Sequence, residues 1–198
     1  MFTYFDATKL KLTKLIALFT IISILQGCAA VAVVAITTGA NMATDRRSIG
    51  NQIDDQSIEL EAYNEITKNK SLNENSNLHI ISVNGSVLLI GQAPSTYLRD
   101  QALNIINQID GVVKIHNQIR IGNVTSITTQ TNDVWLTSKV KTALFSSDEI
   151  NSKNIKVITE NAEVFLMGLV SKQEADAAIQ VTRNISGVNR VFKAFEYL

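Results

Sequence analysis

Hydrophobic and polar positions along the chain follow one pattern that occurs twice. Ile80–Gly91 reads IISVNGSVLLIG, and Val157–Gly168 reads VITENAEVFLMG. Further along, Ile109–Val112 corresponds to Ile185–Val188, and the offset between matching positions stays at about 76–78 residues. Similarity at a nearly constant spacing indicates a duplicated domain, with insertions confined to loops.

Each copy opens with apolar residues at helical spacing. They are Ile58, Ala62, Ile66 and Leu72 in the first copy, and Leu136, Val140, Leu144 and Ile150 in the second. Such a stripe predicts a half-buried helix. Asp54 and Asp55 precede one stripe, and Asn132 and Asp133 precede the other. Since these side chains can accept hydrogen bonds from the first amides of a helix, we expect each helix to be capped there.

Two strands are predicted after each helix. They are Leu78–Ser82 and Val87–Gly91 in the first copy, and Ile155–Thr159 and Val164–Gly168 in the second. Asn84-Gly85 between the first pair is the dipeptide that a tight hairpin turn favours, because both turn positions need a positive φ. The second strand of each pair is almost continuously apolar, which is typical of the centre of a sheet covered on at least one face.

A second helix and a last strand complete each copy. Ser95 and Ser171 are the expected N-caps, and Gly111 and Gly187 the expected C-caps. The core stripe of this helix is Leu98, Ala102, Ile105 and Ile109 in the first copy, and Ala175, Ala178, Thr182 and Ile185 in the second. The last strand is Val112–Ile119 in the first copy and Val188–Phe195 in the second. A crossover helix places the last strand parallel to its neighbour. The predicted fold class is therefore α+β, with two αββαβ units, each of two helices packed on a three-stranded mixed sheet.

The N-terminus has the pattern of an export signal. Lys9, Lys11 and Lys14 precede the apolar run Leu15–Leu25, which is shorter than the roughly 20 residues that span a membrane. Leu25-Gln26-Gly27-Cys28 resembles the lipobox of bacterial lipoproteins, and Cys28 is the only cysteine. We expect cleavage before Cys28 and a covalent diacylglycerol and N-acyl chain on it, with no other cofactor. The alternative is an uncleaved apolar anchor from Leu15 through Ala40, with Cys28 buried in it.

Two or more acyl chains make a stable membrane anchor where one chain would not. Because Ala29, and not Asp, follows the cysteine, resemblance to enteric lipoproteins implies the periplasmic face of the outer membrane. The expected division is a signal peptide over residues 1–27, an acylated tether over 28–53 that includes a solvated Arg46-Arg47 pair, a first domain over 54–121, a linker over 122–131 and a second domain over 132–198.

Charge limits the partners of the mature chain. The full chain has 18 basic and 18 acidic side chains, and removing residues 1–27 takes away three lysines and Asp6, which leaves a net charge of −2. This balance excludes the strongly cationic surface of a nucleic-acid binder. With Cys28 acylated, no thiol remains to form a disulfide, so the fold must depend on its apolar cores.

The repeated motifs resemble the BON domain. The resemblance rests on Val87–Gly91, Val164–Gly168 and the Gly-Val pairs that follow, and it is strongest over Asn132–Ala194. Two copies behind a lipobox imply a periplasmic, non-enzymatic lipoprotein. They also imply binding of anionic phospholipid through the first helix of the second domain, in support of envelope integrity and cell division. Ala162, where the hairpin turn usually has Gly, departs from the family pattern.

The second copy's first helix carries the candidate site. At 100° per residue, Val134, Trp135 and Phe145 point roughly 125–155° away from the core stripe of Leu136, Val140, Ala143 and Leu144. Ser138, Lys141 and Thr142 share this outward side, and Lys139 borders it. The first copy has Gln56, Ser57 and Thr67 at the positions of the apolar trio. Trp suits the headgroup level of a membrane, and lysines are attracted to anionic lipid.

Other interpretations of the outward trio stay open. Trp135 and Phe145 could pack against the first domain or its linker, which would leave no free patch. The same patch, or exposed edge strands, could instead bind an envelope protein, which would make the chain an interaction adaptor. A weaker hypothesis is a spacer that binds the cell wall.

Catalytic chemistry is not indicated. The sequence has no P-loop, no zinc-ligand spacing and no nucleophile elbow, so we expect neither an enzyme nor a metal site nor a small-molecule substrate. His79 and His116 are expected to be ordinary strand residues without a nearby carboxylate. Asp110, Glu160 and Glu163 are expected to be turn and surface charges.

Overall fold

A computed structural model of the chain describes residues 45–198. The predicted signal peptide, the lipidation of Cys28 and residues 28–44 of the tether lie outside these residues and stay predictions.

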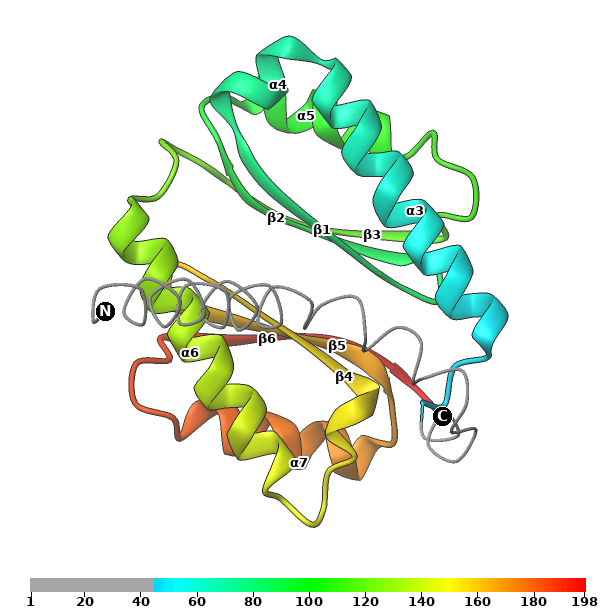
Figure 1. Cartoon of the computed structure of the whole chain (residues 1–198), viewed down its shortest axis with the longest axis vertical. Helices are drawn as coiled ribbons and strands as arrows, with labels where there is room; N and C mark the ends of the chain where they lie inside the picture. Colours follow the sequence, from blue (N-terminus) through cyan, green and yellow to red (C-terminus); the bar gives the residue numbers. More distant parts are fainter. Residues whose placement is uncertain (1–44) are drawn as a thin grey trace, which may run out of the picture. The chain divides into compact units, whose positions relative to one another are not determined.

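Both copies have the expected element order (Figure 1). The first contains α3 (Ile49–Lys68), α4 (Lys70–Asn75), β1 (Asn77–Val83), β2 (Ser86–Ala93), α5 (Thr96–Ile106) and β3 (Lys114–Ile121). The second contains α6 (Ile127–Phe145), the short 3-10 helix η1 (Ser152–Asn154), β4 (Ile155–Glu160), β5 (Glu163–Val170), α7 (Lys172–Arg183) and β6 (Arg190–Tyr197). In each sheet the middle strand is antiparallel to the first and parallel to the last, which confirms the α+β, tandem αββαβ prediction.

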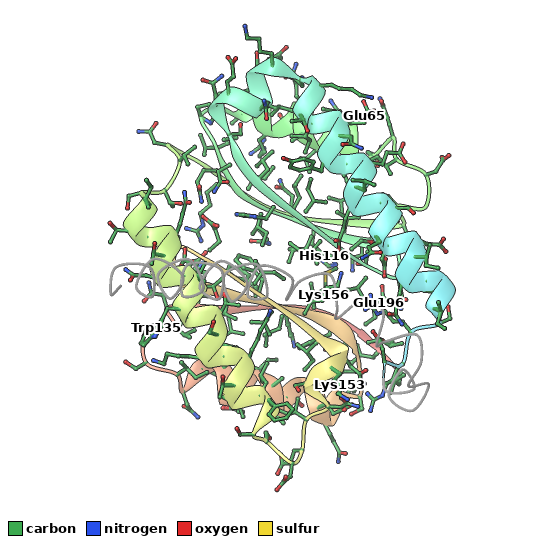
Figure 2. The ribbon with its side chains drawn as sticks, in the orientation of Figure 1. Glu65, His116, Trp135, Lys153, Lys156 and Glu196 are labelled. Atoms are coloured by element: carbon green, nitrogen blue, oxygen red, sulfur yellow. The ribbon has the colours of Figure 1, made fainter. Side chains whose placement is uncertain are left out.

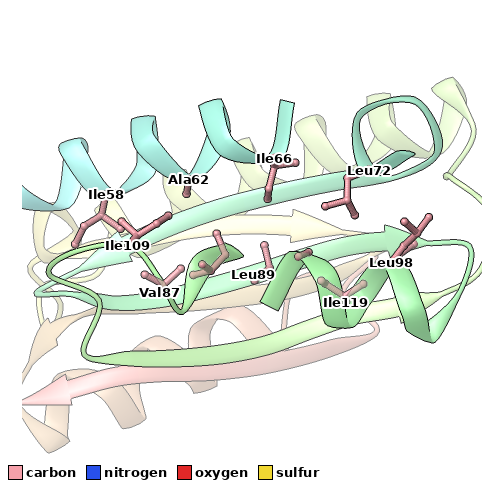
Figure 3. Close-up of a cluster of buried hydrophobic side chains, with 12 residues drawn as sticks. Ile58, Ala62, Ile66, Leu72, Val87, Leu89, Leu98, Ile109 and Ile119 are labelled. Carbon is pink, nitrogen blue, oxygen red and sulfur yellow. The ribbon is translucent and has the colours of Figure 1, made fainter. Parts of the chain in front are cut away.

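Helices cover one face of each sheet. In the first domain, Ile58, Ala62 and Ile66 of α3 point toward Val87 and Leu89 of β2 and are buried with them (Figure 3). In the second domain, α6 and α7 bury an equivalent cluster over β5 that includes Val140, Leu144, Val164, Leu166, Ala175 and Ala178. The predicted core residues are buried, except that Ile106 replaces Ile105 as the fully buried residue of α5 and Ile185 is half-buried. The predicted stripes run past the helices, because Leu72 lies on α4 and Ile109, Ile150 and Ile185 lie beyond the helix ends.

The other faces of the two sheets share a third apolar cluster. Alternate residues of β2 and β5 point away from their own helices, and Leu88 and Ile90 are buried together with Phe165 and Met167. Phe165 also stacks on Phe192, with ring centroids 4.9 Å apart. All eight residues of β2 are therefore buried, and the continuous apolar run in the sequence reflects cover on both faces.

The predicted N-caps of the first helices are wrong. α3 begins at Ile49 behind the N-cap Ser48, and α6 begins at Ile127 behind the N-cap Ser126. Residues 49–53 therefore belong to a helix and not to the tether, and residues 127–131 belong to a helix and not to the linker. Serine accepts from first-turn amides as well as Asp or Asn does.

Asp55 and Asp133 lie inside these helices and hold the hairpin turns. The Asp55 carboxylate accepts hydrogen bonds from the amides of Asn84 and Gly85 at 2.9 and 3.0 Å and from the Ser82 hydroxyl at 2.7 Å. Asp133 accepts from the amides of Asn161 and Ala162 at 2.7 and 2.8 Å. The turn residues have the positive φ that the Asn-Gly signal predicted, including Ala162 at 60°.

The second helices begin at the predicted caps but end before the predicted glycines. Ser95 and Ser171 are N-caps, and Ser171 forms a capping box with Glu174. α5 and α7 end at Ile106 and Arg183, so Gly111 and Gly187 lie in the turns that lead to the last strands and are not C-caps.

The arginine pair before α3 is not a solvated linker. Arg46 donates to the two carboxylate oxygens of Glu174 on α7, and Arg47 donates to Asp45 and to the buried Asp55 on α3. Consecutive residues thus bind the second and the first domain.

Candidate functional site

The candidate site lies on α6, and its orientation follows from the packing of this helix. Leu136, Val140 and Leu144 are buried against the sheet at spacings of four residues. This stripe fixes the rotation of the helix about its axis, so residues on its opposite side face solvent. Figure 2 labels Trp135 beside α6.

The outward apolar trio is exposed, as the sequence predicts. Val134 is 69% exposed, Trp135 is 62% exposed and Phe145 is 74% exposed. A Trp or Phe side chain has a large apolar area, so these two rings in water forgo the free energy that their burial would provide. The alternative in which both rings pack beneath the first domain is wrong for this structure.

Polar residues on the same side complete the predicted set. Lys139 Nζ lies 4.3 Å from the centroid of the Trp135 ring and donates to the Ser186 carbonyl at 2.9 Å. The hydroxyls of Ser138 and Thr142 donate to backbone carbonyls one turn earlier, at 3.1 and 2.9 Å. Lys141 is exposed, and no ion pair involves it within residues 45–198. All seven predicted residues therefore gather along one side of α6.

Two hollows flank this side of the helix. One, of about 480 Å³, lies between α6 and the loop after α7 and is lined by Trp135, Lys139 and Ile185 among others. The other, of about 410 Å³, lies at the C-terminal end of α6 and includes Lys141, Phe145 and Lys153. Both combine an apolar lining with the ammonium group of a lysine, a chemistry that suits an anionic amphiphile.

Two residues of this surface were not predicted from the sequence. Ile127, which is 83% exposed, becomes part of it because α6 begins earlier than predicted. At 100° per residue it falls within about 20° of Val134 and Phe145, so the face extends along the whole helix. Lys153, which Figure 2 labels, comes from η1 and lines the hollow beside Phe145. Only the serine before Ile127 could have indicated the earlier start.

Polar groups away from α6 also differ from expectation. Glu160 and Glu163 are buried and are not surface charges. Glu160 accepts from Gln92 at 2.5 Å and lies 3.5 Å from His79, while Glu163 is paired with Arg120. His79 therefore has a carboxylate neighbour that the sequence did not reveal. Gln92 and Arg120 belong to the first domain, so both of these contacts join the two domains.

Within residues 45–198, no group of three His, Cys, Asp or Glu side chains is arranged to hold a metal ion. No helix of the same range is long and apolar enough to cross a membrane.

Comparison with protein families identifies the fold. The BON domain matches residues 54–123 and again residues 132–198. The chain therefore belongs to the BON domain family and contains two tandem BON domains.

Relatives make the class more specific. The chain is similar to Outer membrane lipoprotein DolP of Haemophilus influenzae, with 36% identity over 94% of this chain and 97% of that protein. It is 40% identical to the 21 kDa hemolysin of Actinobacillus pleuropneumoniae over 78% of this chain and 79% of that protein. Osmotically-inducible protein Y of Escherichia coli is 23% identical over 93% of this chain and 95% of that protein. The chain is thus a dual BON-domain lipoprotein of the outer membrane.

Among solved structures, the C-terminal domain of CdsD from the type III secretion system of Chlamydia trachomatis is 17% identical over 73% of this chain and 67% of that one. Its TM-score of 0.30 is too low to support an inference.

Proposed function

We propose that this lipoprotein binds anionic phospholipid through the outward face of α6 and thereby supports envelope integrity. In this proposal the lipid on Cys28 anchors the chain, and the second BON domain adds a contact that depends on lipid charge. The protein acts by binding and not by catalysis. The observation that carries the proposal is the exposure of Trp135 and Phe145 beside lysines on a folded, otherwise well-packed helix.

The arrangement suits a helix that lies in the plane of the membrane. Ile127 and Phe145 stand at opposite ends of the same face, and at 1.5 Å per residue they are roughly 27 Å apart along the axis. Apolar side chains would enter the acyl boundary while Lys139 and Lys141 stay at the headgroups. Each lysine near an anionic surface contributes about 1 kcal/mol, and the contribution falls as salt increases.

Comparison of the two copies supports α6 over α3. Both helices expose apolar residues, and α3 exposes Ile53, Leu60 and Tyr63. The charges beside them have opposite signs. α3 carries five carboxylates, of which Asp55 is buried and Glu59 and Glu65 are ion-paired, and a single lysine, whereas α6 carries two lysines and a single carboxylate, the buried Asp133. An anionic membrane therefore attracts α6 and repels α3.

Co-sedimentation with vesicles tests the proposal. A soluble fragment from Thr44 onward contains the whole compact unit of the two domains. We expect it to sediment with vesicles that contain phosphatidylglycerol and to remain in solution with pure phosphatidylcholine. Trp135→Glu removes an apolar anchor and adds a negative charge, and it should abolish sedimentation.

Ser57→Glu provides the matched control, because Ser57 occupies the position of Trp135 in the first copy and is also exposed. This variant should bind vesicles as the unmodified fragment does. Equal binding by the fragment and its Trp135→Glu variant would contradict the proposal.

A further inference from the structure

The first BON domain exposes its own apolar helix face. Ile49, Ile53, Leu60 and Tyr63 are between 58% and 68% exposed on α3. At 100° per residue these four side chains fall within an arc of roughly 80°, on the side opposite the buried stripe of Ile58 and Ala62. They lie along one side of the helix over about four turns, with the exposed Gln56 between Ile53 and Leu60, and we call the four apolar residues the α3 stripe. Scattered exposed apolar residues need no explanation, but an aligned set indicates a contact surface.

A hollow with acidic residues in its lining lies on the adjoining side of α3, and none of the four stripe residues lines it. The hollow, of about 470 Å³, lies between α3, the β1–β2 turn and the turn after α5, with Ile58, Gly85 and Gly111 in its lining. Three carboxylates line it: Asp54, Glu61 and Asp110. Each of the three is exposed, and none has a Lys or Arg partner within 4.0 Å among residues 45–198.

The corresponding hollow of the second domain is lined by a lysine and by no carboxylate. Glu61 and Asp110 correspond to Lys139 and Ser186, which lie together in the hollow beside Trp135. The duplicated surfaces have therefore diverged in charge while both kept exposed apolar residues. Repulsion from anionic headgroups makes a second lipid contact unfavourable for the first domain.

We propose that the α3 stripe and its acidic hollow bind a basic amphipathic segment of another protein. Apolar side chains of the partner would cover Ile53, Leu60 and Tyr63, and its Lys or Arg side chains would pair with Glu61 and Asp110. Charge complementarity favours this occupant over the chain's own residues 29–44, which contain no charged side chain, and over an uncharged surface. The protein would then bind the membrane with one BON domain and a protein with the other.

Site-specific photo-cross-linking in living cells tests this proposal on the full-length lipoprotein. A photoreactive phenylalanine replaces Leu60 in one strain. In a control strain it replaces Tyr97, which is 68% exposed on α5 of the same domain. We expect a discrete cross-linked protein from position 60 and none from position 97. Peptide mapping should place the cross-link in a stretch of the partner that is rich in Lys and Arg.

Charge reversal supplies the decisive comparison. Glu61→Lys combined with Asp110→Lys leaves the α3 stripe intact and should reduce the cross-link about tenfold, while the thermal unfolding temperature confirms that the variant is folded. Trp135→Glu should leave the cross-link unchanged, which separates this proposal from the lipid-binding one. A cross-link that resists charge reversal would overturn the inference. So would the absence of a discrete product, or capture only of lipid, of residues 29–44 or of a second copy.

Discussion

Arg46 donates two hydrogen bonds, of 2.6 and 3.0 Å, to the carboxylate of Glu174, and this pair joins the segment before α3 to the first turn of α7. The amide of Arg46 also donates to Asn154 in the second domain, while Arg47 next to it is bound to Asp55 in the first. The segment that leads back toward Cys28 is thus fixed to both BON domains. We infer that these two arginines help to hold the domains in one arrangement.

Replacing Arg46 should weaken this connection. Arg46→Gln removes a bidentate ion pair, and we expect the free energy of unfolding to fall by about 1 kcal/mol, since the pair is partly exposed. Urea unfolding of the soluble fragment measures the change. Lys193→Gln is the control, because Lys193 is exposed on β6 and forms no ion pair within the described part of the chain. Equal stability of the two variants would show that the Arg46 pair contributes nothing.

The same pair makes stability depend on pH. Hydrogen bonds from Arg46, opposed by burial and aided by Ser171, lower the pKa of Glu174 from 4.5 to about 2. Because the pKa of the folded state is lower than that of the unfolded state, the stabilisation is present above about pH 4.5 and is lost as the pH falls toward 2. We expect Glu174→Gln to flatten this part of the stability curve.

Thermal unfolding between pH 2 and pH 7 checks the prediction. The difference between the unmodified fragment and Glu174→Gln should be largest near neutral pH and should shrink below pH 4.5. Asp55 also has a lowered pKa, since hydrogen bonds from Gly85, Ser82 and Asn84 outweigh the effect of its burial. Protonation of Asp55 in acid therefore destabilises the unmodified fragment and Glu174→Gln equally. If the difference in unfolding temperature between the unmodified fragment and Glu174→Gln stays constant from pH 2 to pH 7, the assignment of this pH dependence to Glu174 is contradicted.

Asp55 should matter more than its counterpart Asp133. Asp55 accepts from two turn amides, a hydroxyl and Arg47, whereas Asp133 accepts from two turn amides. In an Asn variant, an NH2 group replaces one carboxylate oxygen. This group is itself a donor, so it cannot accept the hydrogen bond that the oxygen accepted. We expect Asp55→Asn to cost about 2–3 kcal/mol and Asp133→Asn less. Chemical unfolding of both variants measures the order, and the reverse order would be inconsistent with the hydrogen bonds described.

The two hairpin turns respond in opposite ways to exchange of Gly and Ala. Ala162 has φ of 60°, so Ala162→Gly should stabilise the fold by about 1 kcal/mol because it relieves left-handed backbone strain. Gly85→Ala should destabilise it, since a Cβ at Gly85 would lie 2.4 Å from the Gly111 carbonyl oxygen. Thermal unfolding of both variants is the measurement. A lower unfolding temperature for Ala162→Gly would contradict this account of the turn.

Much of the fold was predictable because each local sequence pattern occurs in both copies, and the two copies support the same assignment. The hairpin turns, the caps Ser95 and Ser171 and the parallel last strands all follow from local pattern. The helix starts did not, because the buried stripes that mark these helices begin only at Ile58 and Leu136, well after Ser48 and Ser126. Arg46, Glu160 and Glu163 acquire their roles from residues more than 40 positions away in the chain, and no local pattern encodes those contacts.

The candidate site was predictable for the same reason that the fold was. Once the stripe of Leu136, Val140 and Leu144 is recognised as core, helical geometry places Trp135 and Phe145 on the outside. The acidic hollow of the first domain was not predictable, because it combines α3 with a turn after α5. Asp110 was therefore interpreted as an isolated turn charge. Its significance becomes visible only beside Asp54 and Glu61.

Fluorescence of Trp135 tests the central claim most directly. Trp135 is the only tryptophan of the chain, so the emission spectrum reports on the outward face of α6 alone. On titration with phosphatidylglycerol vesicles, we expect a blue shift that weakens as salt increases and is absent with phosphatidylcholine vesicles. An emission maximum that does not move at saturating anionic lipid would contradict the claim that this indole enters a membrane.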